Sequence, residues 1–132
     1  QAIKQLLLGA KSIGYVKVGA GTPAILALLN GLGISQQVQP KTAYQEGAET
    51  SMRNLADGHV DVSFGLVSEI LPAPGVQFAG PLPPEYQKKV VMSAAIASAA
   101  KNREAAGEII KKLSSGSAAK TIKAAGLDPV AR

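Results

Sequence analysis

Residues 13–33 read IGYVKVGAGTPAILALLNGLG, and this stretch decides the fold. The apolar residues from Ile13 to Val18 predict a short strand, and the glycine turn Gly19-Ala20-Gly21 follows it directly. Thr22 is expected to be the N-cap and Pro23 the first residue of a helix, because the leucines that follow recur at helical spacing. A strand, a tight turn and a helix in this order are typical of α/β proteins.

Strands and helices are also expected on both sides of this stretch. A helix should end near Gly9, and another should run over 47–56 and stop at Gly58. Further strands are predicted at 38–42, 60–67, 76–79 and 89–97. Near the C-terminal end of the chain, Asn102 and Ser117 are expected to cap the last two helices.

The apolar residues between Val60 and Leu66 alternate with small or polar residues, and this predicts the central strand of the sheet. Since strands alternate with helices, the expected fold is a three-layer α/β/α lobe with a mostly parallel sheet. We expect one lobe over residues 1–132, with an α/β core at about 11–97 and C-terminal helices at about 98–132. Five apolar residues are expected to face inward from those helices: Ala106, Ile109, Ile110, Leu113 and Ile122.

The composition excludes several classes of protein. The 132 residues include no cysteine, so disulfides and thiolate metal sites are excluded, and the single histidine offers little for an imidazole site. Aromatic residues make up 4% of the chain, which argues against a platform for stacking bases. No run of 18 apolar residues is present, and residues 1–10 lack the layout of a signal peptide, so we expect any such signal to lie outside this chain.

Charge is distributed unevenly along the chain. Residues 1–87 carry five Lys/Arg and six Asp/Glu, whereas residues 88–132 carry nine Lys/Arg and three Asp/Glu. A basic end of this kind is either a solvated helix face or a surface that attracts nucleic acid or an acidic membrane. No nucleic acid is expected, because aromatic residues do not interleave with the lysines; an interaction or nucleic-acid-binding module remains the alternative function.

The glycine turn allows three interpretations. Gly19 to Ala24 fits the pattern G-x-G-x-x-A of dinucleotide sites, but no acidic residue stands about twenty positions later, where residues 39–41 read QPK. A nucleotide cofactor is therefore not expected, although a small nucleotide-dependent enzyme is a third candidate. The turn is either purely structural or an anion site, since backbone N–H groups at the start of a helix attract anions without a charged side chain.

Two further positions follow predicted strands and are candidates for the same edge of the sheet. Gly47 and Ala48 begin the second helix and offer further N–H groups, while Ser68 offers a hydroxyl after the strand at 60–67. No catalytic residue is predicted. His59 has acidic neighbours in sequence only, and no G-x-S-x-G motif is present.

The order of several motifs resembles one family of transport proteins. The motifs are the glycine turn, residues 55–62 (LADGHVDV), residues 68–72 (SEILP), residues 80–87 (GPLPPEYQ) and residues 124–129 (AAGLDP). In this order and spacing they resemble the molybdate-binding-like periplasmic solute receptors of ABC importers, which are type II periplasmic binding proteins. The resemblance covers about residues 10–129. It implies the C-terminal half of a two-lobed receptor, because members of that family are about twice as long.

The resemblance also implies where a ligand would be held. In the molybdate binders, hydroxyls and backbone N–H groups hold the oxyanion between the lobes. The matching positions in this chain are Ala20, Gly21, Thr22, Gly47 and Ala48. The tyrosine that molybdate binders place after the main strand is replaced by Leu66 or Val67, so the ligand is expected to be molybdate, another oxyanion or an organic acid.

The same resemblance implies partners and a location. The full-length parent would be periplasmic, would deliver its solute to an ABC permease and would not be an enzyme; no cofactor or metal is expected. A truncated receptor would also leave apolar helices without the lobe that covers them, so self-association, as a dimer, is expected.

Overall fold

Three parallel strands form the sheet in a computed structural model that describes residues 1–129. The order of the strands is β2-β1-β3, with β1 at Ile13–Val16, β2 at Thr42–Gln45 and β3 at Val62–Ser63. Ile13 is paired with Thr42 on one side and with Val62 on the other. The three strands run in the same direction, so all of their carboxyl ends lie at one edge of the sheet.

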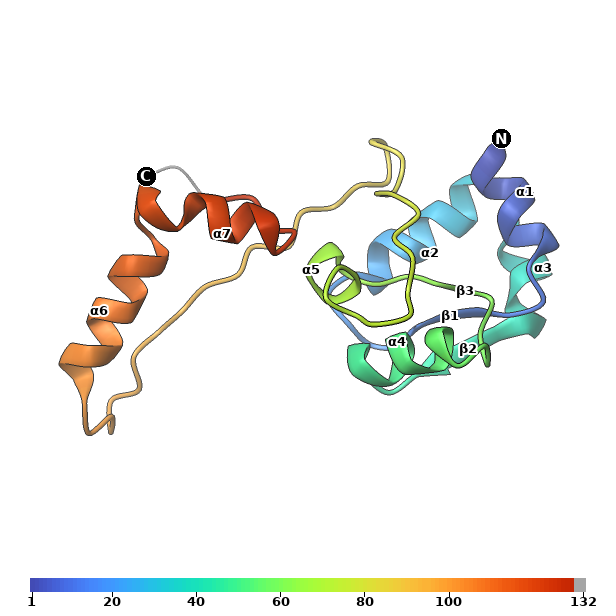
Figure 1. The fold of residues 1–132 in the computed structure, drawn as a ribbon. Helices are drawn as coiled ribbons and strands as arrows, with labels where there is room; N and C mark the ends of the chain where they lie inside the picture. Colours follow the sequence, from blue (N-terminus) through green and yellow to red (C-terminus); the bar gives the residue numbers. More distant parts are fainter. Residues whose placement is uncertain (130–132) are drawn as a thin grey trace. The chain divides into compact units, whose positions relative to one another are not determined.

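The described residues form two compact units, one over Gln1–Val90 and one that begins at Val91. The helices of the first unit are α1 (Ala2–Gly9), α2 (Thr22–Gly31), α3 (Ser35–Val38), the 3-10 helix η1 (Gln39–Lys41), α4 (Ala48–Ala56) and α5 (Val67–Ile70). The second unit contains α6 (Arg103–Leu113), the 3-10 helix η2 (Gly116–Ala118) and α7 (Ala119–Ala124). Figure 1 colours these elements from blue to red along the chain.

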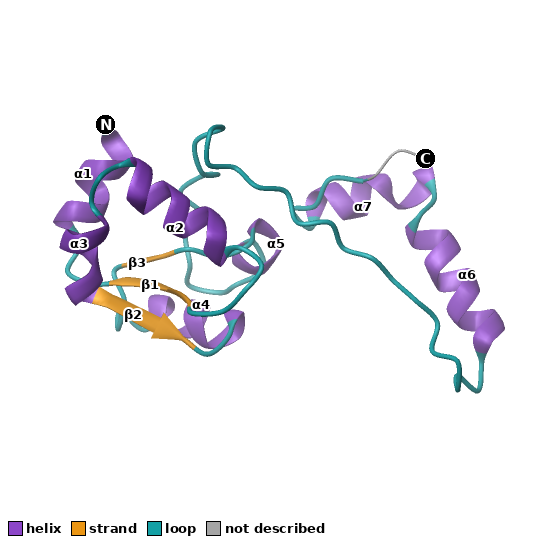
Figure 2. Ribbon diagram, turned by 180° about the vertical axis from the view of Figure 1, so that it is seen from behind, coloured by secondary structure: helices purple, strands orange, loops and turns teal. Residues whose placement is uncertain are grey.

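Helices cover both faces of the sheet, which confirms the predicted α/β class. Helices α1, α2 and α3 lie on one side of the strands and α4 on the other in both views (Figures 1 and 2). Ile13 and Tyr15 point to the first side, where they join a core of buried apolar residues from the three helices: Leu7, Ile25, Leu29, Ile34 and Val38. The burial of this apolar surface is the main stabilising term of the first unit.

On the opposite face, the sheet meets α4 through small and polar groups. A Cβ at Gly14 would come within 3.0 Å of Val60 Cγ1 and 3.2 Å of Ser63 Oγ, so a side chain there would force these neighbours to shift. Ser51 Oγ from α4 lies 2.7 Å from Ser63 Oγ, and Ser63 Oγ donates to the Gly14 carbonyl at 3.1 Å. These bonds satisfy polar groups that would be costly to bury alone.

Glycines lie at the ends of several helices, and the predicted stop at Gly58 is confirmed. Helix α2 ends at Gly31 and Gly33 has φ of +66°, α4 ends before Gly58 with φ of +74°, and the last helix ends before Gly126 with φ of +79°. Asn102 is the N-cap of α6, since its side chain accepts a hydrogen bond from the Ala105 N–H. Each of these signals is local, so it does not depend on distant parts of the chain.

Two predicted caps are wrong. Helix α2 begins at Thr22 with Gly21 as the N-cap, and the Thr22 hydroxyl faces the strand instead of the helix. Helix α7 begins at Ala119 after η2, and the Ser117 hydroxyl pairs with Ser115 Oγ at 2.7 Å. In both cases the hydroxyl bonds to a polar group that precedes it in the chain and not to the helix N–H groups.

The predicted strand pattern is wrong in part. The strand at 60–67 is reduced to Val62–Ser63 and lies at an edge of the three-stranded sheet, whereas β1 is central; Phe64 is only half-buried. Residues 38–41 are helical, because Pro40 suits the first turn of a 3-10 helix, and β2 starts at Thr42. Residues 76–79 and 89–97 form no strand in the described chain, since a strand requires a ladder partner and none is paired with them.

The connector after α5 is anchored on α2. Its residues 80–87 are rich in proline, and the Tyr86 ring packs against Gly31 so closely that a Cβ there would overlap the Tyr86 hydroxyl. This contact holds the connector against the carboxyl end of α2.

The second unit has little core. None of the residues of α6 or α7 is buried, and Ile109 is 61% and Leu113 56% exposed. The expected inward face of these helices is therefore wrong for Ile109 and Leu113, whereas Ala106, Ile110 and Ile122 are half-buried. So short a unit has too few apolar residues to cover the whole face. Among the described residues, no helix combines the length and the apolar character needed to span a bilayer.

Candidate functional site

The candidate site lies where the three parallel strands end. The glycine turn follows β1, the start of α4 follows β2, and residues 64–68 follow β3. Val16 and Gln45, the last residues of β1 and β2, are paired with one another, so the first two of these segments begin side by side. Gly21 and Leu66 also lie close together, because a Cβ at Gly21 would be 3.8 Å from Leu66 Cδ2. The structure thus brings the predicted segments to one edge of the sheet, where open α/β sheets bind ligands.

The glycine turn is tied to β1 by Thr22. Thr22 is buried, and its hydroxyl donates to the Val16 carbonyl at 2.8 Å and accepts from the Gly19 N–H at 3.0 Å. The Thr22 N–H itself donates to the Gly19 carbonyl. Thr22 therefore shapes the turn with polar groups that are already engaged.

The N–H groups that remain in this turn belong to Ala20 and Gly21. The amides of Ala24 and Ile25 bond to the Gly21 carbonyl, and Pro23 has no N–H. Within residues 1–129, the Ala20 and Gly21 N–H groups have no hydrogen-bond acceptor, and both residues are accessible. They are the donors that this turn offers to an anion.

Helix α4 contributes a second set of N–H groups. Its N-cap is Gly47, in extended conformation, and the first helical residue is Ala48; both are half-buried. In the described chain, the N–H groups of these two residues have no acceptor. The acidic residue of this first turn, Glu49, pairs with Arg53 at 2.7 Å, and this contact on the exposed face reduces its repulsion of an anion.

The segment after β3 contributes differently. The Glu69 carboxylate accepts a hydrogen bond from the Leu66 N–H at 3.1 Å. Leu66 is the N-cap of α5, so this carboxylate bonds to the start of its own short helix. Ser68 is half-buried, and its hydroxyl makes no hydrogen bond to a described residue. Its role as a ligand donor stays a prediction.

A cation that the sequence patterns did not single out lies at this edge. Lys17 is the first residue after β1, and its Nζ is 5.4 Å from the centroid of the Tyr44 ring on β2. The Tyr44 ring in turn meets the buried Tyr15 ring edge to face, with centroids 5.5 Å apart. The sequence showed a lysine at the end of a predicted strand. It did not show that this strand pairs with β2, and that pairing brings Lys17 to the Tyr44 ring.

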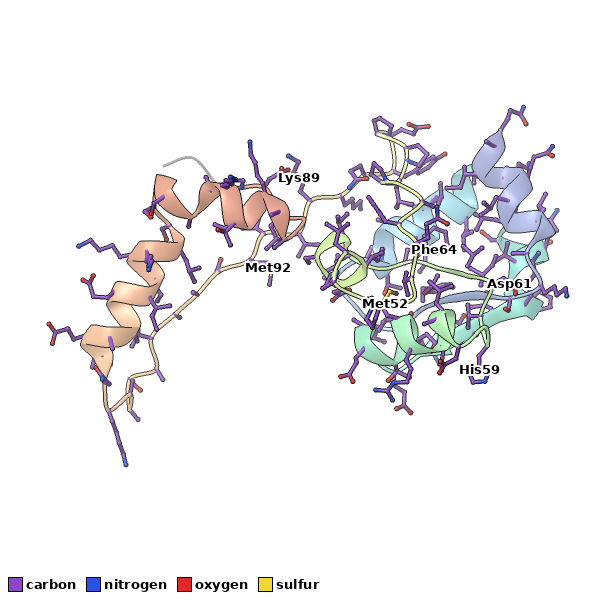
Figure 3. All side chains as sticks on the ribbon, in the orientation of Figure 1. Met52, His59, Asp61, Phe64, Lys89 and Met92 are labelled. Atoms are coloured by element: carbon purple, nitrogen blue, oxygen red, sulfur yellow. The ribbon has the colours of Figure 1, made fainter. Side chains whose placement is uncertain are left out.

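His59 lies away from this edge. It is exposed in the turn between α4 and β3, at the amino end of the strand, and Figure 3 shows its ring pointing outward. Asp61 accepts from the Lys11 N–H at 2.7 Å near the same end of the sheet. Across residues 1–129, no cluster of three or more His, Cys, Asp or Glu side chains is arranged to hold a metal ion.

The comparisons with known proteins point to a family of solute-binding proteins. Residues 2–128 match the model of a family described as bacterial extracellular solute-binding proteins. The chain is also 31% identical over 129 residues to an aconitate isomerase from a Pseudomonas species, an alignment that covers 98% of this chain and 49% of that protein. No solved structure gives a significant match. The chain thus spans about half the length of the curated relative that it matches, and it belongs to the bacterial extracellular solute-binding protein family.

Proposed function

We propose that this chain is the ligand-binding half of a solute receptor and that its solute is a small organic acid. The observation that carries the proposal is the set of N–H groups without acceptors at Ala20, Gly21, Gly47 and Ala48, which follow two paired strands at one edge of the sheet. Such groups at helix starts favour carboxylates and oxyanions alike. The similarity to an aconitate isomerase favours a carboxylate, since aconitate is a tricarboxylic acid. Molybdate is the less favoured ligand, because Leu66 and Val67 lack the expected hydroxyl.

In the longer protein we propose a second lobe that closes over the ligand, a periplasmic location and delivery to an ABC permease. The support is the family membership together with the half-length alignment. In this chain alone, water keeps the other side of the anion, and the effective dielectric constant stays high. We therefore expect a dissociation constant in the millimolar range or weaker, which corresponds to a binding free energy of about −4 kcal/mol.

A titration followed by NMR tests the proposal. The ¹⁵N-labelled chain is titrated with trans-aconitate, molybdate and sulfate, and the amide signals of residues 19–22 and 46–49 are followed. Shifts centred on these residues and on their neighbours at the same edge of the sheet, with millimolar affinity, are expected. Micromolar binding by a monomeric chain would show that the site is complete and that the idea of a half receptor is wrong. The absence of any shift would overturn the proposed function.

One variant removes a single proposed donor. Ala48→Pro deletes the N–H at the first position of α4, where proline is tolerated, and Gly47 already has the extended backbone (φ −167°, ψ 172°) that the residue before proline prefers. A hydrogen bond to a charged group contributes about 1.5–3 kcal/mol, so binding should weaken about tenfold or more. Ala2→Pro, at the first position of α1, is the matched control and should bind like the unmodified chain.

A second candidate is catalysis, favoured by the same relative, whose name is that of an enzyme. We propose that this chain binds and does not convert its ligand. Incubation with trans-aconitate, followed by proton NMR for the cis isomer, separates the two candidates. Isomer formation above the rate in buffer would establish the enzyme and contradict the binding role.

A further inference from the structure

We propose that Lys17, held over the Tyr44 ring, binds one carboxylate of the ligand and makes this edge of the sheet prefer polycarboxylates to anions of single charge. This inference rests on the proposed function, because it assigns a counter-charge to the same site. The N–H groups of the two helix starts attract any anion. The Lys17 ammonium is a separate positive charge at the same edge, so it favours a ligand that has a second carboxylate.

The position of Lys17 distinguishes it from the other cations of the first unit. Lys4 and Lys41 donate to backbone carbonyls at 2.7–2.8 Å, Lys11 precedes β1 at the amino edge, and Arg53 pairs with Glu49. Lys88 and Lys89 belong to the connector beyond α5 and follow no strand. Within residues 1–90, Lys17 is therefore the lysine that follows a strand at the carboxyl edge. It makes no ion pair with a described residue.

Tyr44 provides a defined platform for this lysine. The ring is 53% exposed, so one part of it is open to solvent and to the ammonium group. Its orientation is set by the edge-to-face contact with Tyr15, which is 3% exposed and belongs to the core. A lysine over an aromatic face loses less conformational freedom on binding, because its side chain is partly ordered beforehand.

The acidic residues near this edge limit what Lys17 can attract. Glu49 and Glu69 are engaged with Arg53 and with the Leu66 N–H, whereas Glu46 is exposed directly after β2. Removal of the Glu46 charge should therefore strengthen the binding of a polycarboxylate, and removal of the Lys17 charge should weaken it.

The test compares ligands and variants in the NMR titration. For the unmodified chain, affinity should rise from acetate through succinate to trans-aconitate. Lys17→Gln should weaken trans-aconitate about threefold to fivefold, the range of an exposed ion pair, and should leave acetate nearly unchanged. Lys11→Gln, at the opposite end of the same strand, is the charge-matched control and should bind like the unmodified chain.

Two variants of Tyr44 separate the ring from the hydroxyl. Tyr44→Phe keeps the aromatic ring and should retain the preference for trans-aconitate over acetate. Tyr44→Leu removes the ring and should lose part of this preference. The amide spectra check that each variant is folded. The inference is overturned if Lys17→Gln binds trans-aconitate as well as the unmodified chain, or if Lys11→Gln weakens it equally. In those cases acetate and trans-aconitate still bind, so the proposed function stands; if no anion binds the unmodified chain, the proposed function itself fails.

Discussion

The Thr22 hydroxyl joins the end of β1 to the glycine turn through two hydrogen bonds, one to the Val16 carbonyl and one from the Gly19 N–H. A threonine before proline suggests a helix cap, but the hydroxyl accepts from the Gly19 N–H instead of from a helix N–H group, and it donates to the strand carbonyl. The residue therefore determines the shape of the turn that presents Ala20 and Gly21, and it acts on the proposed site only through that shape.

Thr22→Val should destabilise the chain by about 1–2 kcal/mol, because the valine has nearly the same shape and leaves both backbone partners without the hydroxyl. Urea unfolding measures the change. Thr50→Val, on the exposed side of α4, is the control and should stay within about 0.5 kcal/mol. Equal stability of the two variants would contradict the role assigned to Thr22.

Tyr15 makes the stability depend on alkaline pH. Burial raises the pKa of the Tyr15 phenol above its ordinary value, and the neighbouring Tyr44 adds to the rise. The unfolded chain then loses the Tyr15 proton at a lower pH than the folded chain, so the stabilisation is complete below pH about 10 and is lost as pH rises further. Tyr15→Phe should show a smaller loss of unfolding free energy between pH 9 and about 11 than the unmodified chain. Parallel curves for the two proteins would argue against this assignment.

At the scale of the element, α2 shows how the apolar spacing becomes a core. Leu28 is completely buried, whereas Leu26 is 51% exposed on the other side of the same helix. The spacing of the leucines predicted a helix with one buried face. The residues that share this core, Ile13 of β1, Ile34 at the N-cap of α3 and Val38 of α3, were not evident from this spacing.

Leu28→Ala should cost about 2–5 kcal/mol, through lost burial and the cavity that remains. Leu26→Ala provides the matched comparison and should change the unfolding free energy by less than about 0.5 kcal/mol. Both are measured by denaturant unfolding with a common slope. Similar losses for the two leucines would mean that α2 is covered on both sides.

At the scale of the whole molecule, the two units differ in how much core they contain. The first unit has a buried cluster between the sheet and its helices, whereas no residue of α6 or α7 is buried. Exposed Ile109 and Leu113 lie on one helix, and apolar surfaces of this kind tend to find a partner. In the longer protein we propose that the second lobe is this partner.

This chain by itself should therefore associate with a second copy. Light scattering over a range of concentrations should show a rise in mass towards the dimer. The double substitution Ile109→Glu and Leu113→Glu should restore the monomer, because it places charge in the apolar contact, while Lys111→Gln on the same helix should not. A monomer at every concentration would refute the prediction.

The sequence by itself determined the local elements: the glycines that end helices, the Asn102 cap, the helix at 47–56 and the strand that precedes the glycine turn. These features depend on the backbone preferences of one or a few neighbouring residues, so short stretches contain the necessary information. The alternation of strands and helices also determined the α/β class.

Only the tertiary structure decided which strand is central, that residues 89–97 are not a strand, and that Lys17 lies over Tyr44. Each of these depends on a pairing between segments far apart in the chain. A strand forms only where a neighbour completes its hydrogen bonds, and no local pattern names that neighbour. For the same reason the candidate donors were predictable as helix starts, but their position at one edge followed from the pairing of β1 with β2.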